Sequence, residues 1–244
     1  MLERFAYSQH LLEDTYLEAC SEESLVIKFW AYPFEQFFER QQQLFLQWGE
    51  TISPSCKNSH LNMKLDIRII LSTQGNAYDA GMGEVAKVKA QTASKFYGDK
   101  LKSALASKIH LNDIICSLPY LPPDKVNSIV LPVIQIMGLD CHVYTLRLVE
   151  KHAYLIQDAV KFSFPRSLQQ MRDNGIGEYI SGLHAIAEMI DKLENDINGY
   201  SKNTADKIDG LISKKNANKK SRLAYLTSPV DFCWESDSET EEEE

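Results

Sequence analysis

The chain has 244 residues, 44% of them apolar and 25% charged, which is enough for one large globular domain with appendages. It lacks the apolar run of ~18 residues that a membrane-spanning helix needs, and its first twenty residues do not resemble a secretory signal, so we expect an intracellular protein that does not contact membranes. Five scattered cysteines with no C-x-x-C pair indicate neither a disulfide framework nor a zinc site.

The net charge of −8 is concentrated at the C-terminal end. Residues 231–244 contain eight acidic and no basic side chains, so residues 1–230 sum to zero. We interpret 231–244 as a disordered acidic tail that could bind protein partners. Residues 201–230 read as a basic flexible linker, in which "KKNANKKSR" (214–222) is typical of a nuclear-import signal and favours a nuclear location.

The N-terminal half of the chain predicts a helix followed by a hairpin. Residues 1–24 form a peripheral segment, and 25–200 are expected to form a single globular domain. Residues 33–48 start with a proline and predict a helix that ends at Gly49, followed by a loop over 51–62. From Leu65 the apolar residues alternate, which predicts a strand, a turn over 72–76 and a second extended segment over 77–90. The residues that form the apolar stripe of the predicted helix are Phe34, Phe37, Phe38, Leu44, Phe45 and Trp48.

The second half predicts a long helix, more strands and a closing helix. A helix is expected over 94–118, with Ser94 as its cap, and β-segments over 129–138, 142–149 and 153–164. Residues 176–197 have the period of an amphipathic helix. This order predicts an α/β (α+β) fold, in which a mixed β-sheet is flanked by helices.

Three consecutive elements of this plan each carry one acidic residue: Glu50, Asp66 and Glu84. Mg²⁺ is bound by carboxylate oxygens and water, and a nearby ammonium can stabilise charge that develops on a phosphate. We therefore consider Asp66 and Glu84 as metal ligands, Glu50 as a supporting residue and Lys64 or Lys87 as the ammonium. The alternative is that Asp66 forms an ion pair at a sheet edge, that Glu84 is a solvated hairpin residue and that Glu50 caps a loop.

The order of these acids resembles the PD-(D/E)XK nuclease-like superfamily, whose core carries Glu on a helix, Asp on a strand and Glu-x-Lys on the next strand. The resemblance runs from about Trp48 to Gln135 and implies a restriction-endonuclease-like core, a Mg²⁺ cofactor and DNA as substrate. More narrowly, "KFWAYPFEQFF", "KLDIRIILS", "GMGEVAK" and "PVIQIMGLDCHVYTLRLV" resemble an uncharacterised multi-copy fungal family of the Mucorales type, which is related to mobile elements.

The chain departs from the superfamily pattern at Ala86, where a lysine is expected two residues after Glu84. Lys87 would point to the opposite face of a regular strand. Either a bulge near Gly81 and Gly83 turns Lys87 inward, or the charge is supplied by Lys64 or Arg68; otherwise the site is degenerate.

A second candidate surface is a lysine-rich stretch between residues 87 and 108. Such a face could follow a phosphate backbone, although a solvated helix face explains it equally well. Two functions therefore remain: a metal-dependent DNA nuclease or nuclease-derived nucleic-acid-binding protein, and a non-catalytic protein-interaction module with a degenerate nuclease-like site. The nucleic-acid-binding candidates are Lys89, Lys95, Lys100, Lys102 and Lys108.

Overall fold

The computed structural model describes residues 7–88, 93–201 and 223–230, with side chains of the first helical residues 93–96 left aside. The strands are β1 (Leu44–Thr51), β2 (Leu65–Thr73), β3 (Asn76–Ala86), β4 (Leu131–Met137), β5 (Asp140–Glu150) and β6 (Ala153–Ser163). They form one six-stranded sheet in the order β1-β2-β3-β4-β5-β6. Neighbouring strands are antiparallel except β3 and β4, which are parallel.

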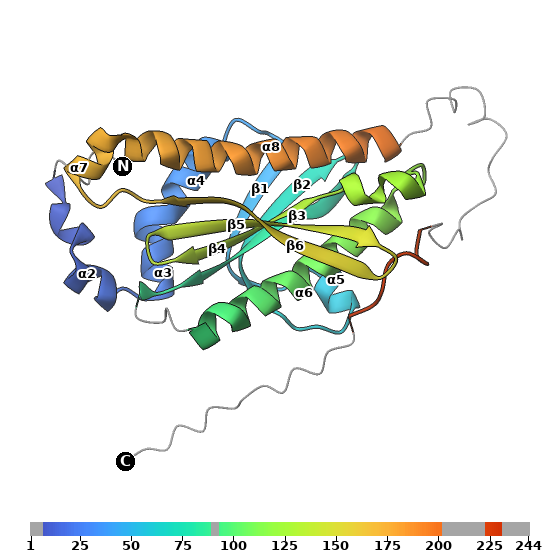
Figure 1. Ribbon diagram of the computed structural model, residues 1–244, viewed down its shortest axis with the longest axis horizontal. Coiled ribbons are helices and arrows are strands. Elements are labelled where there is room, and N and C mark those ends of the chain that lie inside the picture. The colour runs from blue at the N-terminus through green and yellow to red at the C-terminus, as the bar shows by residue number, and fades with distance from the viewer. Residues whose placement is uncertain (1–6, 89–92, 202–222, 231–244) are drawn as a thin grey trace, which may run out of the picture.

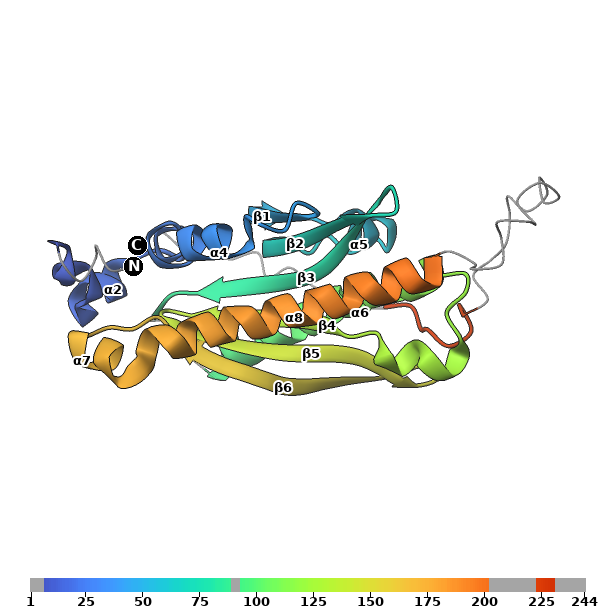
Figure 2. The same ribbon diagram turned by 90° about the horizontal axis from the view of Figure 1, so that it is seen from above.

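The single parallel pair requires a crossover connection, and helix α6 (Ala93–Ser117) provides most of it. Helix α8 (Ile176–Ser201) follows the last strand. The two helices cover opposite faces of the sheet, so the fold has three layers (Figures 1 and 2). The α/β class with a mixed sheet flanked by helices, predicted from the sequence, is confirmed.

Short helices precede β1 and lie in several of the later connections. Before β1 lie η1 (Gln9–Leu12), α2 (Asp14–Ala19), α3 (Glu22–Leu25), η2 (Val26–Trp30) and α4 (Ala31–Phe38). Helix α5 (Pro54–Asn58) separates β1 from β2, and η4 (Pro123–Ser128) precedes β4. Between β6 and α8 lie α7 (Leu168–Gln170) and η5 (Met171–Gly175). None of the helices in the described part of the chain is long and apolar enough to cross a membrane.

The α8 side of the sheet has an aromatic core. Trp30 is fully buried, and its ring stacks on Tyr179 with 5.8 Å between centroids. The indole Nε1 of Trp30 donates a hydrogen bond to the carbonyl oxygen of Gly138 at 2.9 Å, which satisfies the polar atom of a buried ring. Gly182 lets α8 approach β6 closely, because a Cβ there would lie 2.1 Å from the Phe162 ring.

The hairpin of β2 and β3 forms as predicted. Gln74 and Gly75 in its turn both have positive φ, at 52° and 75°, which suits the tight turns of antiparallel hairpins. The register shifts between Ile69 and Ile70 of β2, because β3 contains one extra residue, Ala80, at that point. This bulge resets which β3 residues face α6. The segments predicted for β4, β5, β6 and α8 are also confirmed.

Two local predictions are wrong. The predicted helix over 33–48 ends at Phe38, and Leu44, Phe45 and Trp48 lie on strand β1 instead. Aromatic residues three to four positions apart also fit a helix. The segment from Leu44 to Thr51 is a strand because its residues pair with those of β2 in the sheet. The predicted loop over 51–62 contains α5, whose N-cap Ser53 accepts a hydrogen bond from the backbone of Cys56.

Residues 223–230, which the sequence interpretation includes in the linker, lie against the domain. Leu223 is 3% exposed, and the His152 N–H donates to the carbonyl of Leu226 at 2.9 Å. The carbonyls of Ser228 and Pro229 accept hydrogen bonds from Asn112 and Lys108 of α6. We call residues 223–230 the strap. The basic cluster 214–222 and the acidic tail 231–244 lie outside the described residues.

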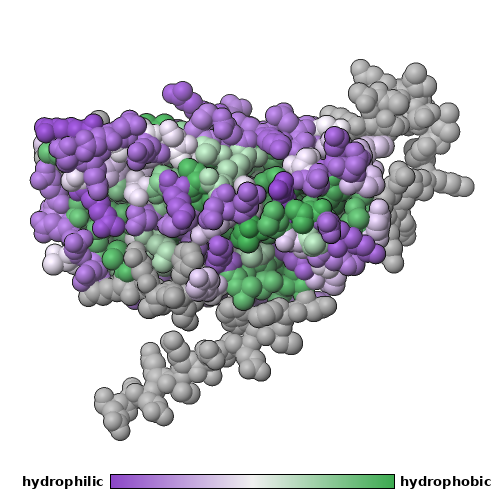
Figure 3. All heavy atoms as spheres, in the orientation of Figure 1, coloured by the Kyte–Doolittle hydropathy of each residue, from purple (hydrophilic) through white to green (hydrophobic). Residues whose placement is uncertain are grey.

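Strand β6 forms one edge of the sheet, and its outward surface is mixed in character. Figure 3 shows hydrophobic patches between hydrophilic residues on the side of the molecule where β6 lies. Leu155 is 38% exposed, whereas Asp158 and Lys161 place charges on the edge. The pairing with β5 shifts at Ala159, and a bulge with charges discourages pairing with another strand.

Candidate functional site

Asp66 and Glu84 lie on neighbouring antiparallel strands and on the same face of the sheet. Ile67 of β2 pairs with Gly83 of β3, so the residues one step outward, Asp66 and Glu84, stand at the same level of the ladder. Asp66 Oδ2 accepts a hydrogen bond from the Val85 N–H at 2.8 Å. The two carboxyl groups that the sequence singled out are therefore brought together beneath α6.

Glu84 is buried and forms an ion pair with a lysine from α6. It is 3% exposed, and Lys102 Nζ lies 2.7 Å from its Oε2 atom. Burial and, to a smaller extent, the charge of Asp66 raise the pKa of Glu84 to about 8, against the opposing effect of the Lys102 ammonium. The other oxygen, Oε1, is buried and has no hydrogen-bond partner among the described residues. Glu84 thus keeps its proton to a higher pH than an ordinary carboxyl group does.

The ammonium that lies next to Glu84 belongs to Lys102 rather than to Lys64, Lys87 or Arg68. Lys87 is exposed just beyond the end of β3, so the bulge in this hairpin does not turn it inward. Lys64 pairs with Glu50 at 2.6 Å, and both side chains are more than half exposed. The sequence placed Lys102 in the lysine-rich stretch; it could not show which of those lysines reaches β3, because that depends on how α6 packs on the sheet.

Glu50 lies on β1 rather than at the end of a helix. The hydrogen bond from Lys64 holds the pKa of Glu50 below its usual value, and the charge of Lys102 acts in the same direction. Glu50 therefore lies on the Lys102 side of the site but is engaged by an exposed ion pair.

Gln135, on the neighbouring strand β4, lies beside Glu84. It pairs with Glu84 in the parallel register of β3 and β4, and it is 2% exposed. The sequence analysis missed it, although a single amide within the apolar run "VLPVIQIM" was a visible signal. A buried amide beside a buried carboxyl offers one more oxygen donor near the site.

A second buried polar cluster lies further along the same face. Arg68 Nε is 2.7 Å from Asp79 Oδ1, and both side chains are less than one-tenth exposed. His110 of α6 contacts the Ser53 hydroxyl through Nε2 at 2.8 Å and lies 4.0 Å from Asp79 Oδ2. Burial lowers the pKa of His110 and raises that of the nearby Cys56, so it favours the neutral form of both side chains. This cluster joins α5 and α6 to the sheet.

The lysines of the predicted nucleic-acid face do not form one uniform stripe. Lys100 lies over the Tyr144 ring at 4.1 Å from its centroid, and Lys108 lies over the Tyr154 ring at 4.9 Å. Lys102 is bound to Glu84 instead. Lys89 lies outside the described residues, as does the side chain of Lys95. The three described lysines are thus shared between intramolecular partners on different strands.

Several polar atoms beneath α6 are buried without a hydrogen-bond partner among the described residues, and they include Glu84 Oε1, Ser103 Oγ, Ser107 Oγ and His110 Nδ1. Each such atom costs ~1–3 kcal/mol if it stays unbonded. Four of them would cost roughly 4–12 kcal/mol, which is comparable with the whole ~5–15 kcal/mol stability of a domain. The interface between α6 and the sheet therefore contains buried polar atoms as well as apolar side chains.

In the described part of the chain, no three or more His, Cys, Asp or Glu side chains are grouped closely enough to hold a metal ion. Asp66 and Glu84 nevertheless supply the hard oxygen donors that Mg²⁺ prefers, and Mg²⁺ commonly needs only one or two carboxylates because it keeps several waters. The unbonded, buried Oε1 of Glu84 is an acceptor that a cation would satisfy. The residues present therefore fit a cation held by two carboxylates.

Comparison of the chain with protein-family models, with curated proteins and with solved structures found no match. The candidate site is therefore argued from its own geometry.

Proposed function

We propose that the chain is a metal-dependent DNA nuclease, or a nucleic-acid-binding protein derived from one. The observation that supports this best is the position of Lys102, whose ammonium lies 2.7 Å from Glu84 on the sheet face that also carries Asp66. The order of elements, from α4 through three antiparallel strands and α6 to the parallel strand β4, agrees with the resemblance to the PD-(D/E)XK nuclease-like superfamily.

In this proposal Asp66 and Glu84 hold the cation and Lys102 stabilises negative charge on the phosphate. A bound Mg²⁺ would supply a Lewis acid and an acidified water molecule. Glu84 must lose its proton before it can bind a cation, so metal affinity rises with pH up to about 8, the pKa of Glu84. The Lys102 ammonium is then released from Glu84 and becomes available to the substrate.

A non-catalytic protein-interaction module is the second candidate, and two observations favour it. No third acidic or histidine ligand joins Asp66 and Glu84 in the described residues, and Glu84 is closed off by its ion pair with Lys102. Under this alternative the charged pair beneath α6 is only structural. Partners would then bind elsewhere, through the acidic tail 231–244, and the basic cluster 214–222 would direct the protein to the nucleus.

Nicking of supercoiled plasmid by the full chain separates the two candidates. The nuclease proposal predicts activity with Mg²⁺ or Mn²⁺ that is abolished by a chelator and reduced at least a hundredfold in Asp66→Asn, Glu84→Gln and Lys102→Met. Glu188→Gln is the matched control, because Glu188 is an exposed carboxylate that lies 3.2 Å from His184 on α8, the helix on the opposite face of the sheet, and we expect its activity to stay within about threefold of wild type.

Two results would exclude the enzymatic candidate. One is wild-type nicking no faster than that of Asp66→Asn at pH 7 to 9 with either metal. The other is nicking that persists in Asp66→Asn and Glu84→Gln alike, which would place the activity in a different site or in a contaminant.

A further inference from the structure

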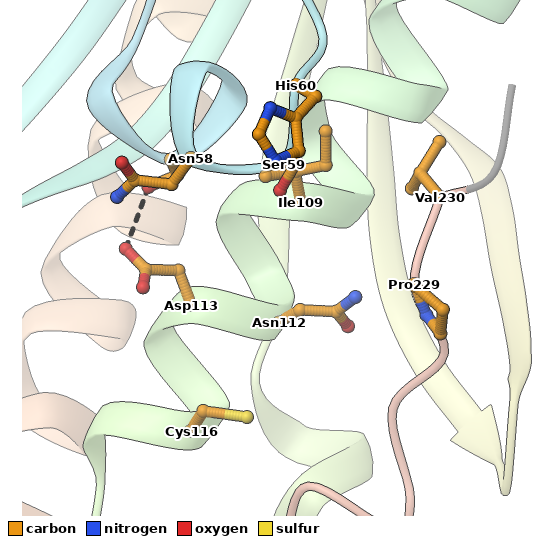
Figure 4. Close-up of a pocket in the computed structure, with 10 residues that line it drawn as sticks. Asn58, Ser59, His60, Ile109, Asn112, Asp113, Cys116, Pro229 and Val230 are labelled. Atoms are coloured by element: carbon orange, nitrogen blue, oxygen red, sulfur yellow. Dashed lines mark hydrogen bonds between the residues drawn. The ribbon is translucent and has the colours of Figure 1, made fainter. Parts of the chain in front are cut away.

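The strap follows one side of α6 toward the N-terminal end of that helix. Three consecutive strap residues contact α6 residues that lie one helical turn apart. The contacts are Thr227 with Cys116 at 4.0 Å, Ser228 with Asn112 at 3.0 Å and Pro229 with Lys108 at 3.1 Å. Figure 4 shows Asn112 pointing from α6 toward Pro229. Because the strap numbers rise while the helix numbers fall, the strap at Val230 runs toward the start of α6.

Tyr154 of β6 holds the strap in this position. Its hydroxyl donates a hydrogen bond to Asn112 Oδ1 at 2.6 Å and accepts one from the Ser228 N–H at 3.2 Å. The Lys108 ammonium, which donates to the Pro229 carbonyl, lies over the Tyr154 ring at 4.9 Å from its centroid. The end of the strap is therefore fixed by contacts with both α6 and β6.

Ahead of the strap, the outer side of α6 carries apolar residues. Tyr97, Leu101 and Leu105 follow one another at intervals of four residues, so they lie on one side of the helix. Lys108 and Asn112, which hold the strap, continue the same line. Tyr97 is 67% exposed and Leu101 is 45% exposed, whereas a helix that covers a sheet normally has polar residues on its outer side. We call Tyr97, Leu101 and Leu105 the outer stripe.

The segment that follows the strap has apolar residues at a spacing that matches the outer stripe. Residues 231–235 read "DFCWE", and Phe232 and Trp234 point to the same side of an extended chain. At ~3.3 Å per residue they lie ~10 Å and ~16 Å beyond the last contact of the strap with α6. At ~1.5 Å per residue along the helix, Leu101 and Tyr97 lie ~10 Å and ~16 Å beyond the same contact.

The charges of the segment and of the helix are complementary. Over residues 97–108, α6 carries three lysines and one acidic residue, Asp99, which is 8% exposed. Residues 231–244 carry eight acidic and no basic side chains. The segment is also tethered to the fixed strap, which sets its local concentration at the outer stripe on the order of millimolar. A weak contact is therefore enough to hold it there.

A pocket of about 470 Å³ between α5, α6 and the strap is the competing position for the segment (Figure 4). Its lining includes the polar side chains of Asn58 and Asn112 and the carboxylate of Asp113, which accepts a hydrogen bond from Ser55 at 2.8 Å. A carboxylate repels an acidic segment, and a polar lining suits aromatic rings less well than the outer stripe does.

We propose that residues 231–235 dock on the outer stripe of α6 within the same chain, with Phe232 against Leu101 and Trp234 against Tyr97. The docked segment continues the interface between the strap and α6 by about three helical turns. The docking is independent of whether the chain cuts DNA.

The indole of Trp234 reports the docking in NMR spectra of the full chain. Trp234→Phe identifies its indole N–H resonance among those of the three tryptophans. We expect NOEs from the Trp234 ring to the methyl groups of Leu101 and to the Tyr97 ring. We also expect the indole chemical shift to differ from its value in a synthetic peptide of residues 229–240.

Two variants test whether the outer stripe causes these signals. In Leu101→Ser the NOEs disappear and the indole shift of Trp234 moves to the peptide value. Ile180→Ser is the matched control, because Ile180 is 50% exposed on α8, the helix on the opposite face of the sheet. In this control the NOEs and the shift stay as in wild type.

Three results would overturn the proposal. One is an indole shift equal to that of the peptide and unchanged by Leu101→Ser. Another is a set of NOEs from the Trp234 ring to Ile109 or His60, which would place the segment in the pocket. The third is NOEs that occur only between differently labelled chains in a mixed sample, which would show docking on a second copy.

Discussion

Replacement of Glu84 by glutamine should change how the stability of the protein depends on pH. In the folded chain the pKa of Glu84 is raised from 4.5 to about 8 by burial and by the charge of Asp66. The folded state therefore binds the proton more tightly than the unfolded state does between these two values. The free energy of unfolding consequently falls as the pH rises through this interval and levels off above pH 8.

The expected size follows from the pKa difference. Each pH unit in this interval removes up to about 1.4 kcal/mol from the free energy of unfolding. From pH 4.5 to pH 8 the loss sums to at most about 5 kcal/mol for wild type. Glutamine has nearly the same shape and does not ionise, so Glu84→Gln lacks this loss. The difference between variant and wild type should thus grow steadily with pH.

Urea unfolding at pH 5, 6, 7, 8 and 9 measures this difference directly. Titrating groups that do not interact with Glu84 contribute equally to both proteins and cancel when one curve is subtracted from the other. Glu50→Gln is the matched control: it removes an exposed carboxyl whose pKa is lowered, so it should not reproduce the growing gap. Parallel curves for wild type and Glu84→Gln would refute the claim that Glu84 is held protonated beneath α6.

Two other substitutions test the packing on either side of the sheet. Arg68→Met leaves Asp79 buried without its ion partner and should lower the free energy of unfolding, measured with urea, by ~3–5 kcal/mol. The double variant Arg68→Met with Asp79→Leu should recover most of that loss. A double variant as unstable as the single variant would contradict this reasoning. Gly182→Ala forces a Cβ against the Phe162 ring and should lower the free energy of unfolding by ~1–3 kcal/mol. Gly199→Ala, on the same helix but with no atom within 4 Å of the added Cβ, should raise that free energy by up to ~1 kcal/mol. A Gly182→Ala protein as stable as wild type would refute the close packing of α8 on β6.

Much of the sheet was predictable because its strands and the helix α8 have clear periods. The alternation from Leu65, the turn at Gln74 and Gly75, and the three later β-segments all reflect local geometry that the sequence records directly. Strand β1 was not predictable in this way. Its aromatic residues follow those of α4 at spacings that fit a helix, and only pairing with β2 decides between the two structures.

The candidate site was predictable in part. Asp66 and Glu84 could be placed on adjacent strands, but the pattern gave no lysine at Ala86 and pointed to Lys64 or Lys87 instead. Lys102 reaches Glu84 from a different element, 18 residues further along the chain. Such a contact depends on the position of α6 over the sheet, which local sequence does not encode. The same reason hid the polar side of α6, because Ser103 and Ser107 look like surface residues in the sequence.

The most direct test of the central claim is a crystal structure of the full chain with Mn²⁺, read through its anomalous signal. The account predicts one peak at ~2.1 Å from oxygen atoms of both Asp66 and Glu84, with Lys102 withdrawn from Glu84. No peak at this position at saturating Mn²⁺ and pH 9, with the Lys102 to Glu84 contact intact, would contradict it.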